Sequence, residues 1–492
     1  MRKWLPLLAV SLGTFMLLVD VTIVNVALPS MATGLGASFG ELQWVIDIYA
    51  LALAALLLGV GSLADLFGRR RLYVSGLILF AAASTVCGAA PDATTLIVAR
   101  GVQGVGAAAM FATTIALLTH TYRGKDLGIA FGVWGAVNGA AAAAGPIAGG
   151  LLTEAISWRW VFFVNVPISV GAVLLTLRVV AESRQSGKVR IDVPGIVTFT
   201  AAASAVVFAA LRAGDAGWLS AQTLALLAGA AVCLALLVAI ERRSSAPMLE
   251  LALLRRGSFS GAVIGAALLS ASAFACLAYT SIWLQSVLGL SPIEAGLVFL
   301  PLSASAFAVS AGIGRFLHGS NPRWIISAGL LLIGIGAFLQ SGLDAGSDWS
   351  SLTAGLLFVG VGVGLANPSL VSTGMAAVPR RNGGMASGAV NTGRQLGLAL
   401  GIAALGSVFQ SRLISTLGDG VGHAVSGGGA QGVLARHAAT DELIHGAVAS
   451  GLHAAFLVSG GIGVAGAIVV AALVRKPAPE PAFAPAAELA ST

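Results

Sequence analysis

Residues 61–71 read GSLADLFGRRR, a short polar stretch that separates two long apolar runs. It contains glycines at Gly61 and Gly68, one carboxylate at Asp65 and three arginines at its end. We expect the glycines to permit a tight turn, Asp65 to accept hydrogen bonds, and the arginines to hold the loop on the cytoplasmic side of a membrane. The stretch therefore predicts a short inner connection between two membrane-spanning helices.

The composition of the whole chain fits a lipid environment. Of its 492 residues, 57% are hydrophobic and 10% are charged, whereas a soluble domain carries about 25% charged residues. No soluble core of this length buries so much apolar surface. The net charge of +7 comes from basic residues scattered among apolar runs, so we expect no nucleic-acid partner. The cysteines Cys87, Cys233 and Cys276 lie inside apolar runs and predict no disulfide framework.

Fourteen apolar segments predict fourteen transmembrane helices, because each is close to the ~20 residues that span a bilayer. They lie near 5–28, 42–63, 72–90, 94–118, 128–152, 159–180, 193–212, 219–240, 258–287, 293–316, 324–341, 351–373, 384–411 and 450–474. The N-terminal run is similar to a signal peptide, but Asp20 interrupts it and many spans follow. We interpret it as the first transmembrane helix.

The lysines and arginines predict the orientation. With the N-terminus in the cytoplasm, 21 of the 27 basic residues are cytoplasmic, four are external and two lie within spans. We therefore expect a multi-pass protein of the inner (cytoplasmic) membrane with both termini cytoplasmic. The long external loop 412–449 contains His423, His437 and His445, which we interpret as solvated residues rather than as a pH sensor.

The spans group as six, two and six, which predicts an all-α polytopic membrane protein. We expect an N-terminal six-helix bundle over 1–180 and a linker with two additional transmembrane helices over 181–250. A C-terminal six-helix bundle over 251–474 and a flexible cytoplasmic tail over 475–492 follow. Repeated bundles that rock around a central site are a common transporter design.

Ionisable groups inside a bilayer are unfavourable, and they are functional candidates for that reason. The clearest are Asp20, Asp47, Arg100 and Arg394. A rise of ~1.5 Å per residue puts Asp20 ~13 Å, Asp47 ~8 Å and Arg100 ~9 Å below the outer surface, where they can meet. Arg394 lies ~15 Å from the inner end of its helix, near the midplane.

A membrane carboxylate beside a movable cation is a natural proton carrier. Desolvation favours the protonated acid and a nearby cation favours the ionised form, so a motion that alters either one captures or releases a proton. We interpret Asp20 as the coupling carboxylate and Arg100 as both its structural anchor and its modulator. For Asp47, coupling and a static pair that pins helices together stay equal alternatives.

Helical spacing selects residues that share faces with these groups. The candidate substrate cavity consists of Met16, Gln103, Tyr279, Trp283, Asn391, Arg394 and Gln395. Tyr279 and Trp283 stand at i,i+4, a spacing that is equally compatible with plain packing.

A glycine-rich stretch marks the fifth predicted span. Residues 145–150 read GPIAGG, and they contain Gly145, Pro146, Gly149 and Gly150. Glycines four residues apart let helix backbones approach closely, and a proline kinks a helix.

Together these motifs resemble the major facilitator superfamily, specifically its fourteen-helix drug:proton antiporters of the EmrB/QacA type, over nearly the whole chain. Gly61, Asp65, Gly68, Arg69 and Arg70 are similar to the signature loop of that superfamily. The other similar segments are 20–29 (helix-1 motif), 96–108 (helix-4 proton motif), 139–150 (antiporter motif of helix 5) and 158–167 (start of helix 6).

One position departs from the signature loop. Leu66 stands where the family usually has a basic residue. We therefore expect Asp65 to rely on Arg69 or Arg70 and on a helix N-terminus.

The resemblance implies the major facilitator fold and a proton-coupled antiporter that exports drugs or other small amphipathic molecules by alternating access. It also implies that Asp65 faces the N-terminus of the 384–411 helix, near Asn382–Gly384. The alternatives are an exporter of a specific natural product or metabolite, or a proton symporter of the same fold.

A membrane enzyme, a receptor or an ATP-driven pump is a rival from another class. The sequence has no cluster with metal-ligand spacing and no nucleophile–base pairing. Its Gly124-Lys125-Asp126 and Gly187-Lys188-Val189 lack the Ser or Thr of a phosphate loop. We expect no enzyme activity, metal, cofactor or nucleotide. The expected partners are a small-molecule substrate, protons and the lipid bilayer.

Overall fold

The structure is a computed structural model that describes residues 2–37, 39–183, 192–244, 247–316, 321–379, 382–435 and 439–475. The side chains of some residues inside helices, among them Asn25 and Pro146, lie outside this description. The described chain is helical, and its elements are η1 (Arg2–Trp4), α1 (Leu5–Leu35), α2 (Phe39–Phe67), α3 (Arg69–Gly88), α4 (Ala93–Thr121), α5 (Gly124–Ala155), α6 (Trp160–Phe163), α7 (Asn165–Val179), α8 (Val193–Ala216), α9 (Ala221–Arg243), α10 (Leu251–Leu254), α11 (Gly257–Ala273), α12 (Ala275–Ile282), the π-helical turn η2 (Trp283–Val287), α13 (Pro292–Val298), α14 (Leu300–Phe316), α15 (Pro322–Gln340), η3 (Trp349–Leu352), α16 (Thr353–Ala376), α17 (Gly383–Leu417), α18 (Asp419–Ser426), α19 (Ala430–Ala435) and α20 (Asp441–Leu473).

Thirteen stretches of helix in the described residues are long and apolar enough to cross a membrane. The predicted span 128–152 lies in α5, which is a continuous 32-residue helix although some of its side chains are not described. The predicted all-α polytopic fold is therefore confirmed. Three predicted spans are interrupted by single residues or a π turn, at α6–α7, at α11–α12–η2 and at α13–α14.

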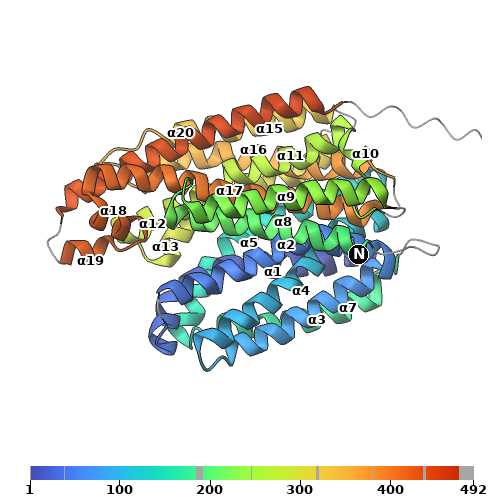
Figure 1. Cartoon of the computed structure of the whole chain (residues 1–492), viewed down its shortest axis with the longest axis horizontal. Helices are drawn as coiled ribbons and strands as arrows, with labels where there is room; N and C mark the ends of the chain where they lie inside the picture. The colour runs from blue at the N-terminus through green and yellow to red at the C-terminus, as the bar shows by residue number, and fades with distance from the viewer. Residues whose placement is uncertain are drawn as a thin grey trace, which may run out of the picture.

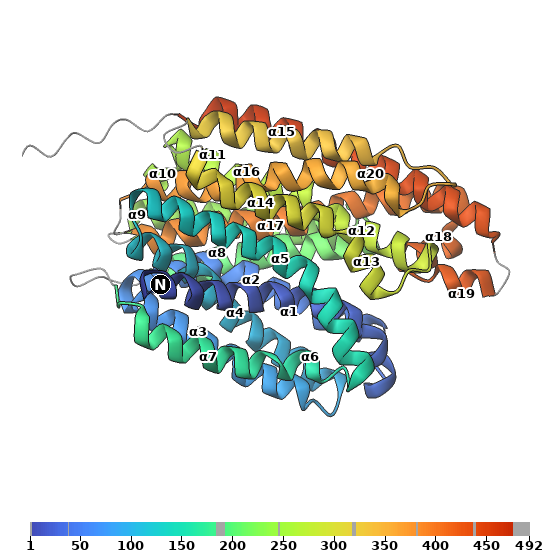
Figure 2. The same cartoon turned by 180° about the vertical axis from the view of Figure 1, so that it is seen from behind.

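The helices form two bundles that lie side by side (Figure 1). The first bundle consists of α1–α7 and the second of α11–α20. The beginning of α1 and the end of α20 lie at the same end of the molecule (Figures 1 and 2). The predicted tail 475–492 lies outside the described residues beyond Arg475, as do 184–191 of the linker.

The two additional helices flank the junction between the bundles. Helix α8 packs against α9, α2 and α17. Its C-terminal half is held by Trp44, whose ring lies 5.7 Å from that of Phe208. Just after the end of α8, Trp218 Nε1 donates to Ser407 Oγ at 2.8 Å. The pair therefore contacts both bundles through α8.

Close helix contacts join the bundles along two seams, α2 with α17 and α5 with α14. At the first seam, a Cβ on Gly61 would lie 2.6 Å from the carbonyl oxygen of Gly384. At the second, a Cβ on Gly132 would lie 2.3 Å from the carbonyl oxygen of Ser310. Both separations are too short for any side chain, so glycine is what lets these helices meet.

The predicted loop over 61–71 is mostly helix, which corrects our expectation. Helix α2 continues through Asp65 to Phe67, and α3 begins at Arg69. Gly68 makes the turn with φ of +106°, a backbone conformation that glycine adopts readily. The prediction of a turn at Gly61 was wrong, because that residue lies within α2 and serves the contact with α17.

The predicted external loop 412–449 is also largely helical. Helix α17 continues to Leu417, α18 and α19 follow, and α20 begins at Asp441. His423 Nδ1 lies 2.8 Å from Gln410 Nε2, and His445 Nε2 lies 3.6 Å from an oxygen of Asp441. His437 lies outside the described residues. The glycine-rich composition concealed these short helices.

Candidate functional site

Asp20 is the centre of a buried polar network inside the first bundle. Its carboxylate accepts hydrogen bonds from Arg100 Nη1 at 2.6 Å, Gln103 Nε2 at 3.0 Å and Asn165 Nδ2 at 2.8 Å. Gln103 Nε2 also donates to Ser84 Oγ at 2.7 Å. These five residues come from α1, α3, α4 and α7, so one carboxylate joins four helices.

Arg100 connects this network to a fifth helix, α2. Its Nε donates to the carbonyl oxygen of Val45 at 3.0 Å, and its guanidinium lies 4.1 Å from the centre of the Tyr49 ring. The hydroxyl of Tyr49 is buried and has no hydrogen-bond partner. Arg100 is therefore held to α2 through a carbonyl and an aromatic face, and to Asp20 through an ion pair.

The ion pair is excluded from water, since the Asp20 and Arg100 side chains are 0% and 1% exposed. Breaking such a pair by removing one partner typically costs about 3–5 kcal/mol, because a buried charge stays behind. The pair is neutral as a whole. A proton delivered to Asp20 would leave the cation of Arg100 without its counter-ion, which couples protonation to the packing of α1 against α4.

The glycine motif of α5 lies next to Asp20 along the neighbouring helix. A Cβ on Gly145 would lie 1.7 Å from Thr22 Oγ1, and one on Gly149 would lie 2.9 Å from the carbonyl oxygen of Ile23. Both contacts are on the turn of α1 that follows Asp20. Gly150 instead faces α13 of the second bundle, where its Cβ would lie 3.4 Å from Ile293. Helix α5 continues through position 146.

Two residues that we expected in a substrate cavity are packed inside the first bundle instead. Gln103 is fully buried in the Asp20 network, and the Sδ of Met16 accepts a hydrogen bond from Ser169 Oγ at 3.2 Å. Helical spacing correctly placed Met16 beside Asp20 and Gln103 beside Arg100. Helical spacing could not show that the helix faces of Met16 and Gln103 point into the first bundle rather than into the space between the two bundles.

Asp47 is half-buried on α2, between Val45 and Tyr49, which provide the carbonyl and the ring that contact Arg100. The expected meeting of Asp20 with Arg100 is present in the structure. The role of Asp47 stays a prediction.

A second cluster closes the seam between α2 and α17 at the end where α2 ends and α17 begins. Asp65 accepts hydrogen bonds from Arg69 at 2.7 and 2.9 Å, and from the backbone N–H groups of Gly384 at 2.9 Å and Met385 at 3.1 Å. Those two N–H groups belong to the first turn of α17, where the helix dipole favours an anion. Arg70, the alternative partner, binds the carbonyl oxygen of Val180 instead.

The linker that follows α9 reaches the same place. Ser62 Oγ donates to the carbonyl oxygen of Met248 at 3.1 Å, and Asn382 Nδ2 donates to Glu250 Oε1 at 2.9 Å. Residues 248–250 therefore bind both sides of the Asp65 contact. No motif in residues 248–250 indicated this role for the linker.

A third cluster lies where the bundles face each other. Arg394 donates to Asn367 Oδ1 and lies 5.4 Å from the centre of the Trp134 ring on α5. Asn391, one turn earlier on α17, donates to the carbonyl oxygen of Phe111 on α4 at 3.1 Å. Gln395, on the same helix, is half-buried.

Tyr279 and Trp283 lie within the second bundle. The Tyr279 hydroxyl donates to the carbonyl oxygen of Ile402 at 2.6 Å, and its ring lies 5.2 Å from that of Phe409. Trp283 is 1% exposed. These contacts favour the packing alternative over a place in a cavity.

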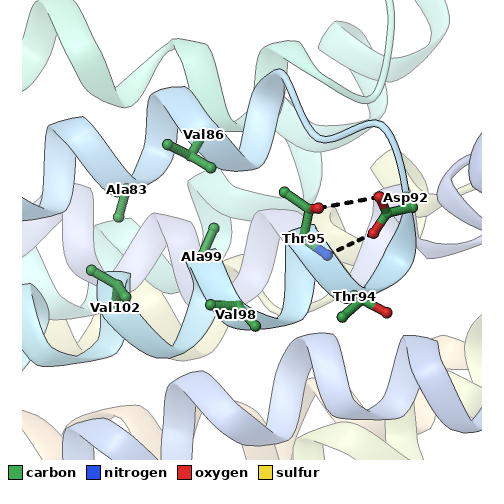
Figure 3. A pocket seen from close by; sticks show the side chains of 8 residues that line it. All are labelled: Ala83, Val86, Asp92, Thr94, Thr95, Val98, Ala99 and Val102. Carbon is green, nitrogen blue, oxygen red and sulfur yellow. Dashed lines mark hydrogen bonds between the residues drawn. The ribbon is translucent and has the colours of Figure 1, made fainter.

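A surface hollow of about 660 Å³ lies elsewhere, between the C-terminal half of α3 and the N-terminal half of α4 (Figure 3). Its lining includes the exposed residues Val86, Val98 and Val102. Asp92, which also lines it, caps α4 by accepting the N–H of Thr95 at 2.8 Å. The five residues of the Asp20 network do not line this hollow.

Sequence reasoning missed Asn165 and Ser84 as members of the Asp20 network. Each is a polar residue in an apolar span, which was the available signal. Their partner could not be deduced, because it depends on how α7 and α3 pack around α1.

The family profile described as Major Facilitator Superfamily matches residues 10–402. The chain belongs to this superfamily. Among its superfamily relatives is "Multidrug resistance protein Stp" of Mycobacterium tuberculosis (strain CDC 1551 / Oshkosh), which is 38% identical over 84% of this chain and 77% of that protein. The "Tetracenomycin C resistance and export protein" of Streptomyces glaucescens is 32% identical over 97% of this chain and 93% of that protein.

The superfamily fold is also seen in solved structures. The human protein in the structure titled "Crystal structure of the human organic anion transporter MFSD10 (TETRAN)" superposes with a TM-score of 0.65 at 14% identity. The match covers 95% of this chain and 99% of that chain. At this identity the likeness concerns the fold of the superfamily alone.

Proposed function

We propose that this protein is a proton-coupled antiporter that exports drugs or other small amphipathic molecules across the cytoplasmic membrane by alternating access. The observation that carries the proposal is the fully buried Asp20–Arg100 pair, a carboxylate and its cation in the middle of a membrane bundle. The names of the two relatives, which refer to multidrug resistance and to antibiotic export, support the cargo.

Asp20 is the proposed proton carrier. In the closed network its carboxylate accepts three hydrogen bonds from cationic or amide donors. When α1 moves relative to α4 and the guanidinium withdraws, the carboxylate loses its counter-ion, and a proton takes the place of the cation. Return of Arg100, guided by Val45 and Tyr49 on α2, expels the proton.

The glycines of α5 link this motion to the second bundle through helix contacts. Gly145 and Gly149 seat α5 against the turn of α1 beside Asp20, and Gly150 on the same helix touches α13 of the second bundle. A shift of α1 on protonation therefore moves the helix that lies at the junction of the bundles.

The proposed cytoplasmic gate consists of Asp65, Arg69 and the first turn of α17. With its contacts formed, the inner end of the α2–α17 seam is closed. Opening toward the cytoplasm requires that Asp65 leave the N–H groups of Gly384 and Met385. The contacts of Met248 and Glu250 make the linker part of this gate.

We propose that residues 1–180 and 251–474 move as two units, with 181–250 as a linker that follows both.

We also propose that both termini are cytoplasmic, as the distribution of arginine and lysine predicts. Cysteines at Ser426 and at Arg475, in a chain without its native cysteines, test this orientation. A membrane-impermeant thiol reagent added to intact cells should label only the first.

Transport into proteoliposomes tests the coupling. With the cytoplasmic face outward, an antiporter accumulates substrate when the lumen is acidic, whereas a symporter does so when the outside is acidic. A panel that includes tetracenomycin C, with empty liposomes as the control for passive partition, separates the two. Equal accumulation with and without the gradient would exclude both.

A further inference from the structure

We propose that Arg394, Asn391 and Trp134 form a binding site for the acidic group of an aromatic substrate, a carboxylate or an ionised phenol. This inference rests on the proposed function, since it names the substrate class of the same exporter. It starts from Arg394, an arginine within a membrane-spanning helix of the second bundle.

Arg394 has no acidic partner in the described part of the chain. Its interactions are the hydrogen bond to the amide oxygen of Asn367 and the contact with the Trp134 ring. Its Nε is buried and has no hydrogen-bond acceptor. A guanidinium with five donors is left with a positive charge and unsatisfied donor capacity.

The two arginines that are buried in the described residues each have a carboxylate partner. Arg100 is paired with Asp20 at 2.6 Å, and Arg69 is paired with Asp65 at 2.7 Å. Arg394 is the twelfth residue of α17. It therefore lies about 17 Å from the start of that helix, close to the midplane of the membrane. An arginine retained there without a carboxylate needs an anion from elsewhere for at least part of the transport cycle.

Asn391 adds a second free group on the same face of α17. Residues three apart on a helix are neighbours, so Asn391 and Arg394 point the same way. The Asn391 side chain is 0% exposed, and its Oδ1 has no hydrogen-bond donor. A ligand that bears an acidic oxygen for the Arg394 Nε and a hydroxyl for the Asn391 Oδ1 would satisfy both.

The surroundings place this site between the bundles. Trp134 belongs to α5 and Phe111 to α4, whereas Arg394 and Asn391 belong to α17. The Trp134 Nε1 donates to Thr14 on α1 at 3.2 Å, which fixes the plane of the indole. The ring is fully buried beside the cation in this closed arrangement. When the bundles separate, its flat apolar face would suit an aromatic or polycyclic acid.

Equilibrium binding of three pyrene probes to the purified full-length protein, without any pH gradient, tests the proposal. The probes are 1-pyrenebutyrate, its neutral amide and the cationic 1-pyrenebutylamine. We expect the wild type to bind the acid about tenfold more tightly than the amide, the factor expected of one hydrogen bond to a charged group. The amine should bind most weakly.

Three substitutions test which residues cause the preference for the acid over the amide. Arg394→Gln should weaken binding of the acid about tenfold or more and leave the amide unchanged, and Arg394→Lys should keep part of the preference. Asn391→Asp places an internal anion beside Arg394 and should also weaken binding of the acid. Arg159→Gln is the matched control, because Arg159 stacks on Trp158 at 4.3 Å outside the seam.

The proposal is overturned if the wild type binds the amine as tightly as the acid, or fails to bind the acid. It is also overturned if Asn391→Asp and any folded Arg394 variant bind the acid as the wild type does. An acid preference together with transport that ignores the pH gradient would leave this site intact and refute the proton coupling.

Discussion

The carboxylate of Asp20 lies 2.6 Å from Nη1 of Arg100, and neither side chain reaches solvent. This contact joins the first helix of the chain to the fourth. Everything proposed about coupling depends on it, because a buried ion pair can exchange its cation for a proton only if the helices move.

Asn165 supports the ionised form of Asp20 by donating a hydrogen bond at 2.8 Å. Its replacement in Asn165→Leu removes that donor and leaves the carboxylate with its contacts to Arg100 and Gln103. Gradient-driven transport by the purified protein should therefore slow, whereas equilibrium binding of the same substrate should not change. Ser169→Ala is the control, because Ser169 on the same helix binds Met16 rather than Asp20. Unchanged transport in Asn165→Leu would show that proton coupling does not need this donor.

Gly145 should tolerate no side chain. In Gly145→Ala the new Cβ would lie 1.7 Å from Thr22 Oγ1, so α1 and α5 must separate. Overpacking of this kind typically costs about 1–3 kcal/mol. Transport by purified protein and its thermal unfolding should both fall. Gly150→Ala is the matched control with ordinary contact at 3.4 Å, and equal behaviour of the two variants would contradict the packing account.

Asp65 should hold the cytoplasmic gate closed. Asp65→Asn replaces a charge-assisted acceptor of two N–H groups of α17, an effect of about 1.5–3 kcal/mol on the closed state. A cysteine at the buried Ser387, in a chain without native cysteines, should then react about ten times faster or more with a reagent added on the cytoplasmic side. The protein should remain inserted and folded.

Glu182→Gln is the control for that experiment. Glu182 accepts the backbone N–H groups of Arg70 and Arg71 at 3.1 Å and thus caps α3 within the first bundle, without crossing the seam. Its loss should not change the reactivity at Ser387. If Asp65→Asn also leaves the reactivity unchanged, Asp65 is no gate.

Glu250 offers a separate test of the linker. Glu250→Gln weakens the hydrogen bond from Asn382 at the start of α17. We expect a smaller acceleration of labelling at Ser387 than in Asp65→Asn, in the same direction. A slower reaction than in the wild type would mean that the linker favours the open gate.

Much of the fold could be predicted because lipid imposes simple rules. Apolar length gave the spans, whereas the orientation that arginine and lysine indicate stays a prediction. The superfamily motifs gave the family. The external loop was misjudged, since glycine-rich sequence conceals the short helices α18 and α19.

The site was only partly predictable. Depth along a helix correctly brought Asp20 to the level of Arg100, because both are measured from the same surface. It could not separate Asp20 from Asp47, which has a similar depth. The rotation of a helix about its own axis decides whether a side chain faces the interior of one bundle or the space between the two. The sequence around Met16 or Gln103 carries no information on that rotation.

The most direct test of the central claim is gradient-driven accumulation in proteoliposomes by the wild type, Asp20→Asn and Asp47→Asn, with equilibrium binding of the same substrate as a check on folding. Asp20→Asn should bind substrate yet fail to accumulate it against its gradient. Asp47→Asn should retain most of its activity. If Asp20→Asn still accumulates substrate uphill on a pH gradient, the proton does not travel on Asp20 and the account is wrong.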